Sequence, residues 1–74
     1  MGMSKSIYLK DYRNMIEKLK KARLGAGLKQ EDVASKLEKP QSYVSKIERG
    51  ERRLDIVELK KIAKIYNKNI IYFI

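Results

Sequence analysis

The stretch that decides the fold spans residues 28–52 and reads LKQEDVASKLEKPQSYVSKIERGER. Apolar residues recur at steps of three and four in two short segments, about 30–37 and 40–49, which predicts two amphipathic helices. Pro40 suits the first position of the second helix, since that position needs no N–H donor. Helices this short, joined by so few residues, cross steeply, and this arrangement predicts a helix-turn-helix.

Further helices are expected on both sides of this pair. An apolar stripe over residues 8–26 predicts a long amphipathic helix, which Gly27 ends in a left-handed conformation. Asp55 is followed three residues later by a glutamate, a capping-box pattern that predicts the start of another helix. Residues 70–74 are apolar throughout and fit either a short fifth helix or an extended segment. The predicted fold is therefore all-α, a compact bundle of four to five short helices.

Composition limits the kinds of function that the chain can have. It has 74 residues and a formal net charge of +9, and it contains neither cysteine nor histidine. Without these residue types, thiolate nucleophiles, histidine bases and ordinary zinc sites are excluded, so no enzyme, cofactor or metal site is expected. The excess positive charge favours a phosphate-bearing partner, and a solvated lysine-rich surface is the plain alternative. No signal peptide or membrane span is expected.

The domain boundary is expected close to the start of the chain. Residues 8–74 are predicted to form one folded domain, because a chain of this length supports a single small core. Residues 1–7 are expected to be a flexible lead, which could include a cloning remnant ahead of a native Met3.

Residues 28–34 and 41–52 match, in order and spacing, a known motif. Over residues 19–72 the chain resembles the Cro/C1-type (XRE-like) helix-turn-helix family of phage repressors and their bacterial relatives. The family often has glycine where Glu38 stands and serine or threonine where Lys29 stands. The resemblance implies a lambda-repressor-like fold and a sequence-specific transcriptional regulator that binds double-stranded DNA. It also implies a cytoplasmic, nucleoid-associated protein of a bacterium or phage.

The resemblance places the second helix of the motif, about residues 40–49, in the DNA major groove. Glutamine can pair bidentately with adenine, and lysine suits guanine. The residues expected to contact bases are Gln41, Ser42, Ser45 and Lys46. The residues expected to contact the DNA backbone, some with mixed roles, are Gln30, Tyr43, Arg49, Arg52, Arg53, Lys20 and Lys21. The alternative for each of them is an ordinary solvated or core-edge residue. Lys60, Lys61 and Lys64 are expected to form a solvated face of the last predicted helix.

Two charged residues are expected to be structural. Arg23 falls on the inward stripe of the first helix, and Glu48 lies beside the inward Ile47. A charge on an inward face needs a partner, and arginine forks well onto a carboxylate. In the family, the matching pair forms a semi-buried salt bridge between the first helix and the recognition helix.

The apolar end of the chain predicts a homodimer. Five consecutive apolar side chains cannot all face one small core, because any regular conformation points some of them away. We expect a twofold dimer on a near-palindromic operator, since a dimer spaces two recognition helices by one DNA turn. The expected interface residues are Tyr66, Ile71, Tyr72, Phe73 and Ile74. The alternative is a tail absorbed into the core or frayed, with dimerisation only on DNA.

Several biological roles fit the sequence. A phage-type repressor, a controller of restriction–modification genes, and an antitoxin with a toxin as partner all agree with the size and charge. Residues 3–7 are the candidate for a toxin-binding segment. Two rivals are a protein-interaction module that has lost DNA binding and an amphipathic peptide that coats membranes. The polar face over residues 41–46 argues against the first, and apolar stripes that mesh into one core argue against the second.

Overall fold

The computed structural model describes the backbone of residues 2–74 and the side chains of residues 10–74. Its elements follow one another in the order α1 (Gly2–Gly25), α2 (Gln30–Leu37), α3 (Gln41–Glu48), α4 (Ile56–Ile65) and the 3₁₀ helix η1 (Ile70–Phe73). The predicted all-α fold is confirmed, since these elements include no strand within the described residues. None of the described helices is both long and apolar enough to cross a membrane.

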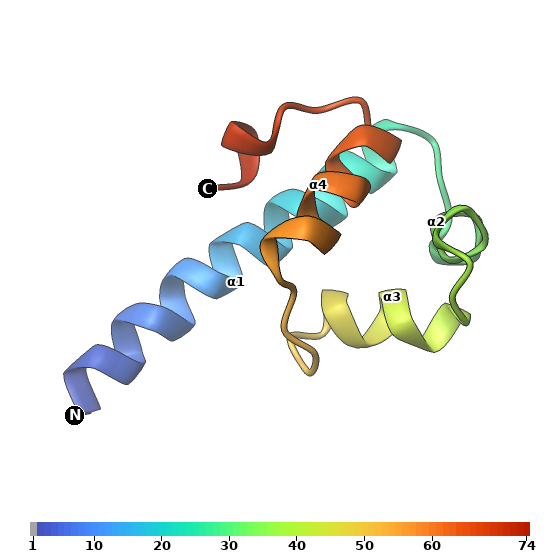
Figure 1. Ribbon diagram of the computed structural model, residues 1–74. Coiled ribbons are helices and arrows are strands. Elements are labelled where there is room, and N and C mark those ends of the chain that lie inside the picture. The colour runs from blue at the N-terminus through green and yellow to red at the C-terminus, as the bar shows by residue number, and fades with distance from the viewer. Residues whose placement is uncertain (1) are drawn as a thin grey trace.

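α1 is the longest helix of the fold and runs from the N-terminus at the lower left of Figure 1 to a position beside α4. It begins at Gly2, which corrects the predicted start at residue 8. Met1 lies outside the described residues, as do the side chains of residues 3–7, the expected toxin-binding segment. The helical pattern thus extends further towards the N-terminus than the apolar stripe indicates.

A Schellman motif ends α1 at the predicted glycine. Gly27 has a φ of +72°, a left-handed conformation that a side chain would strain. Its N–H donates to the carbonyl of Leu24 at 3.0 Å, and the N–H of Leu28 donates to the carbonyl of Arg23 at 3.1 Å. These two bonds satisfy carbonyls at the helix end and turn the chain towards α2.

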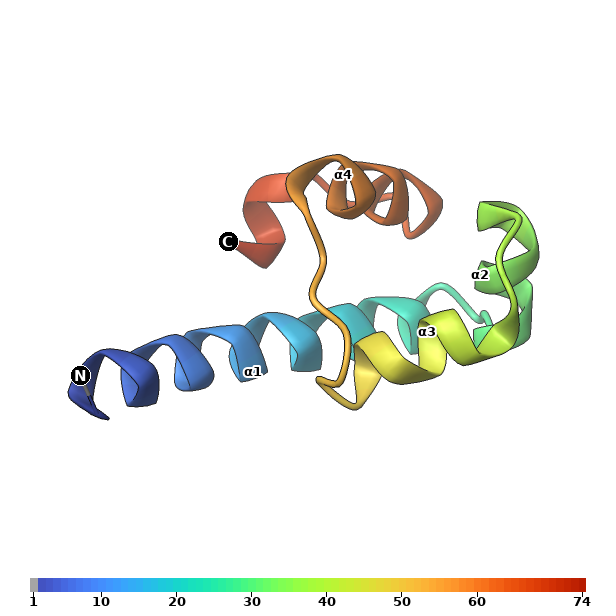
Figure 2. The same ribbon diagram turned by 60° about the horizontal axis from the view of Figure 1, so that its bottom comes forward.

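α2 and α3 form the helix-turn-helix. Figure 1 views α2 almost along its axis and α3 from the side, so the two helices cross steeply. Glu38 ends α2 in the left-handed region, with φ 57° and ψ 44°, a position that glycine would fill with less strain. Pro40 is the N-cap of α3 and not its first helical residue, because its ψ of 156° is extended. α3 lies at the edge of the molecule, and no described element lies beyond it (Figures 1 and 2).

A single core unites all the elements. α4 starts in the predicted capping box, in which Asp55 accepts a hydrogen bond from the N–H of Glu58 at 2.8 Å. Ile56, the first residue of α4, is exposed. The core residues are Leu19, Ala22, Val33, Ala34, Val44, Ile47, Leu59, Ile62, Ala63, Tyr66 and Phe73. Each large apolar side chain buried there contributes roughly 1.5–3 kcal/mol, which fixes the angle between the two short helices of the motif.

The end of the chain folds back as η1 onto α1 and α4 (Figure 2). Phe73 is 2% exposed and Tyr66 is 4% exposed, so both belong to the core of the chain itself. Both were expected in a dimer interface, and within one chain they are already buried, so little of their surface is left for a partner. Ile71 and Ile74 remain 70% and 73% exposed, and Tyr72 is also exposed.

Candidate nucleic-acid interface

The exposed face of α3 carries the four side chains that were expected to read bases. Gln41, Ser42 and Lys46 are exposed and Ser45 is half-buried, whereas the opposite face of the helix is buried in the core. Gln41 and Ser42 occupy the first two helical positions. The N-terminal turn of a helix carries a partial positive charge and unpaired N–H groups, so this end suits the surroundings of a phosphate backbone.

A buried ion pair fixes α3 against α1. The guanidinium of Arg23 donates from Nε to Oε2 of Glu48 at 2.7 Å and from Nη2 to Oε1 at 3.0 Å. Its Nη1 donates to the carbonyl of Leu28 at 2.9 Å. Only 8% of the Arg23 side chain and 5% of the Glu48 side chain are exposed. The hydrogen bond to Glu48 raises the pKa of Arg23, and the two parallel bonds hold the C-terminal end of α3 in one orientation.

The side-chain amide of Gln30 links the Glu48 carboxylate to the exposed face of α3. Gln30, the first residue of α2, donates from Nε2 to Oε1 of Glu48 at 3.0 Å. Its own Oε1 accepts a long hydrogen bond of 3.5 Å from Nε2 of Gln41. Because an ionised carboxylate only accepts, the Gln30 amide has one orientation, with its oxygen towards Gln41. The side-chain oxygen of Gln41 then stays available to accept from a base.

A second cluster holds the loop after α3. The hydroxyl of Tyr43 donates to Oε2 of Glu58 on α4, and Nη2 of Arg52 donates to the same oxygen at 3.2 Å. The Arg52 guanidinium also stands 4.7 Å from the centre of the Tyr43 ring. From α1, the Tyr12 hydroxyl donates to the Arg52 carbonyl at 2.8 Å. Tyr43 and Arg52, expected to contact the DNA backbone, therefore lie in an intramolecular cluster that joins three helices to the loop.

The hydrogen bonds of this cluster change the acidity of its members. The Tyr43 hydroxyl, donating to Glu58, lowers the pKa of that carboxyl, and Arg52 lowers it further. Burial, followed by the bond to Glu58, raises the pKa of Tyr43. Glu58 raises the pKa of Arg52. At neutral pH the cluster consequently contains a carboxylate, a guanidinium and a neutral phenol.

The other residues that were predicted to contact the DNA backbone lie on two different faces of the molecule. Arg49 pairs with Glu51 at 3.2 Å, and Arg53 is exposed with no ion pair among residues 10–74. Lys20 is exposed on α1. Lys21 lies instead beside the end of α4 and the tail, where it lines a hollow with Tyr66, Lys68 and Tyr72. The structure therefore does not bring Lys21 together with the recognition helix.

Arg13 belongs with the candidate interface, although the sequence reasoning did not include it. It lines a hollow with Glu17, Arg49 and Gly50, where α1 meets the end of α3. Arg13 lies seven residues before Lys20, so both lie on one face of the helix. This spacing in the sequence could have indicated that Arg13 belongs with Lys20.

The chain is similar in sequence and fold to known proteins. A family model described as Helix-turn-helix matches residues 19–73. A solved structure described as an XRE-family like protein from Pseudomonas syringae pv. tomato str. DC3000 superposes with a TM-score of 0.92 and is 33% identical. That match covers 99% of this chain and 89% of the other chain. A comparison with curated proteins found no match.

Proposed function

Because this chain belongs to the XRE-like helix-turn-helix family of DNA-binding regulators, we propose that it is a sequence-specific repressor or controller of transcription. The observation that carries the proposal is the exposed polar face of α3, with Gln41 oriented by the hydrogen-bond chain from Glu48 through Gln30. In this proposal α3 enters the major groove of double-stranded DNA in the bacterial or phage-infected cytoplasm.

Gln41 and Lys46 are the proposed base readers with the clearest chemistry. The Gln41 amide can accept from N6 and donate to N7 of an adenine, because one of its two N–H groups is still free beside the bond to Gln30. Lys46 can donate to O6 and N7 of a guanine. Ser42 and Ser45 add shorter hydroxyl contacts from the same face.

Arg53, Lys20 and Arg13 are the proposed contacts to DNA phosphates. All three are exposed, and none has an ion pair among residues 10–74. Arg49 can join them by exchanging its exposed partner Glu51 for a phosphate. Such contacts set the register on the duplex and carry no sequence information.

Selection of duplexes from a random pool tests this function directly. On the selected site, Gln41→Ala and Lys46→Ala should each weaken binding by about 1–3 kcal/mol, with little change on random DNA. Arg53→Ala should weaken both kinds of duplex about equally and reduce the salt slope by about one unit. Lys60→Ala, an exposed lysine on α4, serves as the control. If both α3 variants bind the selected site like the parent protein, α3 is not the recognition helix.

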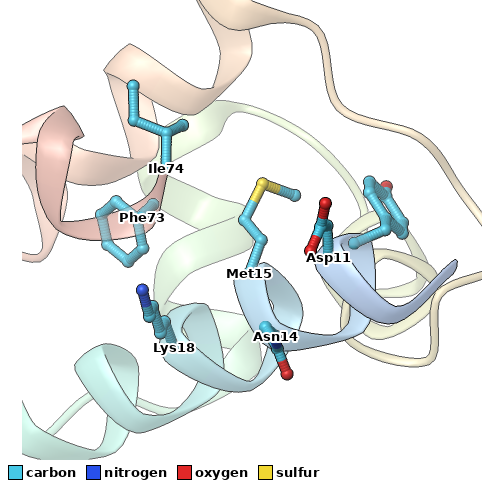
Figure 3. A pocket seen from close by; sticks show the side chains of 7 residues that line it. Asp11, Asn14, Met15, Lys18, Phe73 and Ile74 are labelled. Carbon is cyan, nitrogen blue, oxygen red and sulfur yellow. The ribbon is translucent and has the colours of Figure 1, made fainter. Parts of the chain in front are cut away.

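We further propose that the protein binds DNA as a homodimer through its tail. Ile71 and Ile74 are exposed aliphatic side chains at the chain end, and exposed apolar patches favour association. Beside them a groove runs between α1 and the tail (Figure 3), lined by Asp11, Tyr12, Asn14, Met15, Lys18, Phe73 and Ile74. A twofold dimer would cover this surface and set the two recognition helices about 34 Å apart, one turn of DNA.

Sedimentation of the free protein at tens of micromolar tests the dimer. The informative variant is Ile71→Glu with Ile74→Glu, because both side chains are exposed and their replacement leaves the core intact. Ile56→Glu is the matched control, since Ile56 is also an exposed isoleucine but lies at the start of α4. A parent that sediments as a monomer, or a tail variant that still dimerises, contradicts this interface.

A further inference from the structure

Arg52 has two partners in the free protein, and both hold its guanidinium against the body of the domain. Its Nη2 lies 3.2 Å from Oε2 of Glu58, and its guanidinium lies over the Tyr43 ring. The backbone of the same residue is held as well, through the hydrogen bond from Tyr12 to its carbonyl. Because the Arg52 side chain is 44% exposed, a DNA phosphate can also approach its guanidinium, and it then competes with the Glu58 carboxylate for the same cation.

Glu58 is well placed to retain Arg52. It occupies the third helical position of α4, where its other oxygen accepts from the Asp55 N–H at 3.2 Å. The Tyr43 hydroxyl fixes the oxygen that Arg52 uses. A carboxylate held by several donors is preorganised for its arginine, so little side-chain entropy is lost when the pair forms.

Resting on the proposed DNA-binding function, we propose that Glu58 competes with DNA phosphate for Arg52 and so withholds one cation from sequence-independent binding. The exposed Arg53, next in the chain, has no such partner among residues 10–74 and contributes its full charge to DNA. Two adjacent arginines of one loop thus have different roles. Arg52 holds the loop and packs on Tyr43, whereas Arg53 contacts the DNA backbone.

The slope of log affinity against log salt concentration measures the difference, because it changes by about 0.9 for each phosphate neutralised. In the parent, Arg52→Ala should change the slope by less than half of that amount. In a Glu58→Gln background, the same substitution should change it by about 0.9, since Arg52 is then free to contact phosphate. Arg53→Ala should change the slope by about 0.9 in both backgrounds and is the matched control.

Glutamine is the appropriate replacement for Glu58. Its single amide oxygen can accept from the Asp55 N–H and keep the capping box, while its NH₂ group can donate to the Tyr43 hydroxyl oxygen, which accepts as well as donates. Glu51→Gln removes a carboxylate from the same loop without touching Arg52, so it separates competition at Arg52 from the general effect of one added charge. Thermal melting of each variant verifies folding.

The outcomes separate the inference from the function on which it rests. A slope change of about 0.9 for Arg52→Ala already in the parent, or the same smaller change in both backgrounds, overturns the competition while DNA binding stands. The competition is also overturned if Arg52→Ala changes the salt slope by the same amount in the Glu51→Gln background as in the Glu58→Gln background. A parent that binds no selected duplex overturns both proposals.

Discussion

The substitution Glu48→Ala should remove most of the stability of the domain. Glu48 receives three hydrogen bonds in the structure, two from Arg23 and one from Gln30. Alanine would leave the Arg23 guanidinium, which is nearly buried, without a counter-charge and with only the Leu28 carbonyl as acceptor. A buried charge that loses its partner destabilises the folded state far more than the loss of an exposed pair does.

The magnitude follows from the burial of the pair. Breaking a buried ion pair costs about 3–5 kcal/mol, whereas an exposed pair contributes about 0–1 kcal/mol. Folded domains have about 5–15 kcal/mol of stability in total, and small ones are at the low end. At about 4–8 °C per kcal/mol, the melting temperature of Glu48→Ala should fall by on the order of 12–40 °C.

Thermal melting followed by circular dichroism measures this change. Glu51→Ala is the matched control, since it breaks the Arg49 pair, whose side chains are 58% and 55% exposed, and its melting temperature should hardly change. The double variant Arg23→Met with Glu48→Leu should recover much of the loss, because it replaces the whole buried pair with apolar side chains. A folded Glu48→Ala with the melting temperature of the parent would refute the structural role of this pair.

Four further substitutions test the backbone conformation at the helix ends and the cluster around Glu58. Glu38→Gly should raise the free energy of unfolding by about 0.5–1 kcal/mol in urea titrations, because it relieves the left-handed strain at φ 57° and adds some freedom to the unfolded chain. Gly25→Ala should stabilise the folded state by about 0.5–1 kcal/mol, because Gly25 is helical and has open space around it. Gly27→Ala should destabilise the folded state by about 1–2 kcal/mol, because Gly27 has a positive φ. Equal effects of the two substitutions on the free energy of unfolding would contradict this. Glu58 has a lowered pKa, mainly through Tyr43, so its stabilisation is complete above the ordinary glutamate pKa of about 4.3 and disappears as pH falls through the lower folded value. The difference in stability between the parent and Glu58→Gln should therefore shrink in acid, and a constant difference down to the acid transition would contradict the assignment.

Local patterns predicted the elements of this fold well. The bounds of α2 agree with its apolar spacing, and the glycine cap of α1 and the capping box of α4 are formed by the residues that the sequence indicated. These features depend on interactions within about four residues, which a sequence displays directly. The start of α1 was missed, because helical propensity can extend a helix beyond the apolar stripe that packs on the core.

Contacts between distant elements were harder to predict. Phe73 and Ile74 are neighbours in one apolar run, yet the first is buried and the second exposed, because the 3₁₀ geometry of η1 decides which one meets the core. The cluster of Tyr43 with Arg52 and Glu58 depends on how the loop packs α4 against α3, and no spacing in the sequence encodes it. The inward position of Arg23 predicted a need for a charged partner, whereas the family resemblance implied that Glu48 is that partner.

In the proposed DNA complex, the hydrogen-bond chain from Glu48 through Gln30 to Gln41 would couple operator preference to folding, because the Gln41 amide would take part in both. A new side chain at Gln41 would then change both the base contact and the donor that the Gln30 oxygen receives. Lineages that drift towards another operator must then change the two positions together, or pass through an intermediate with an unsatisfied amide. Among relatives, the residues aligned with Gln30 and Gln41 should consequently vary as a pair, whereas those aligned with Ser42 should vary alone.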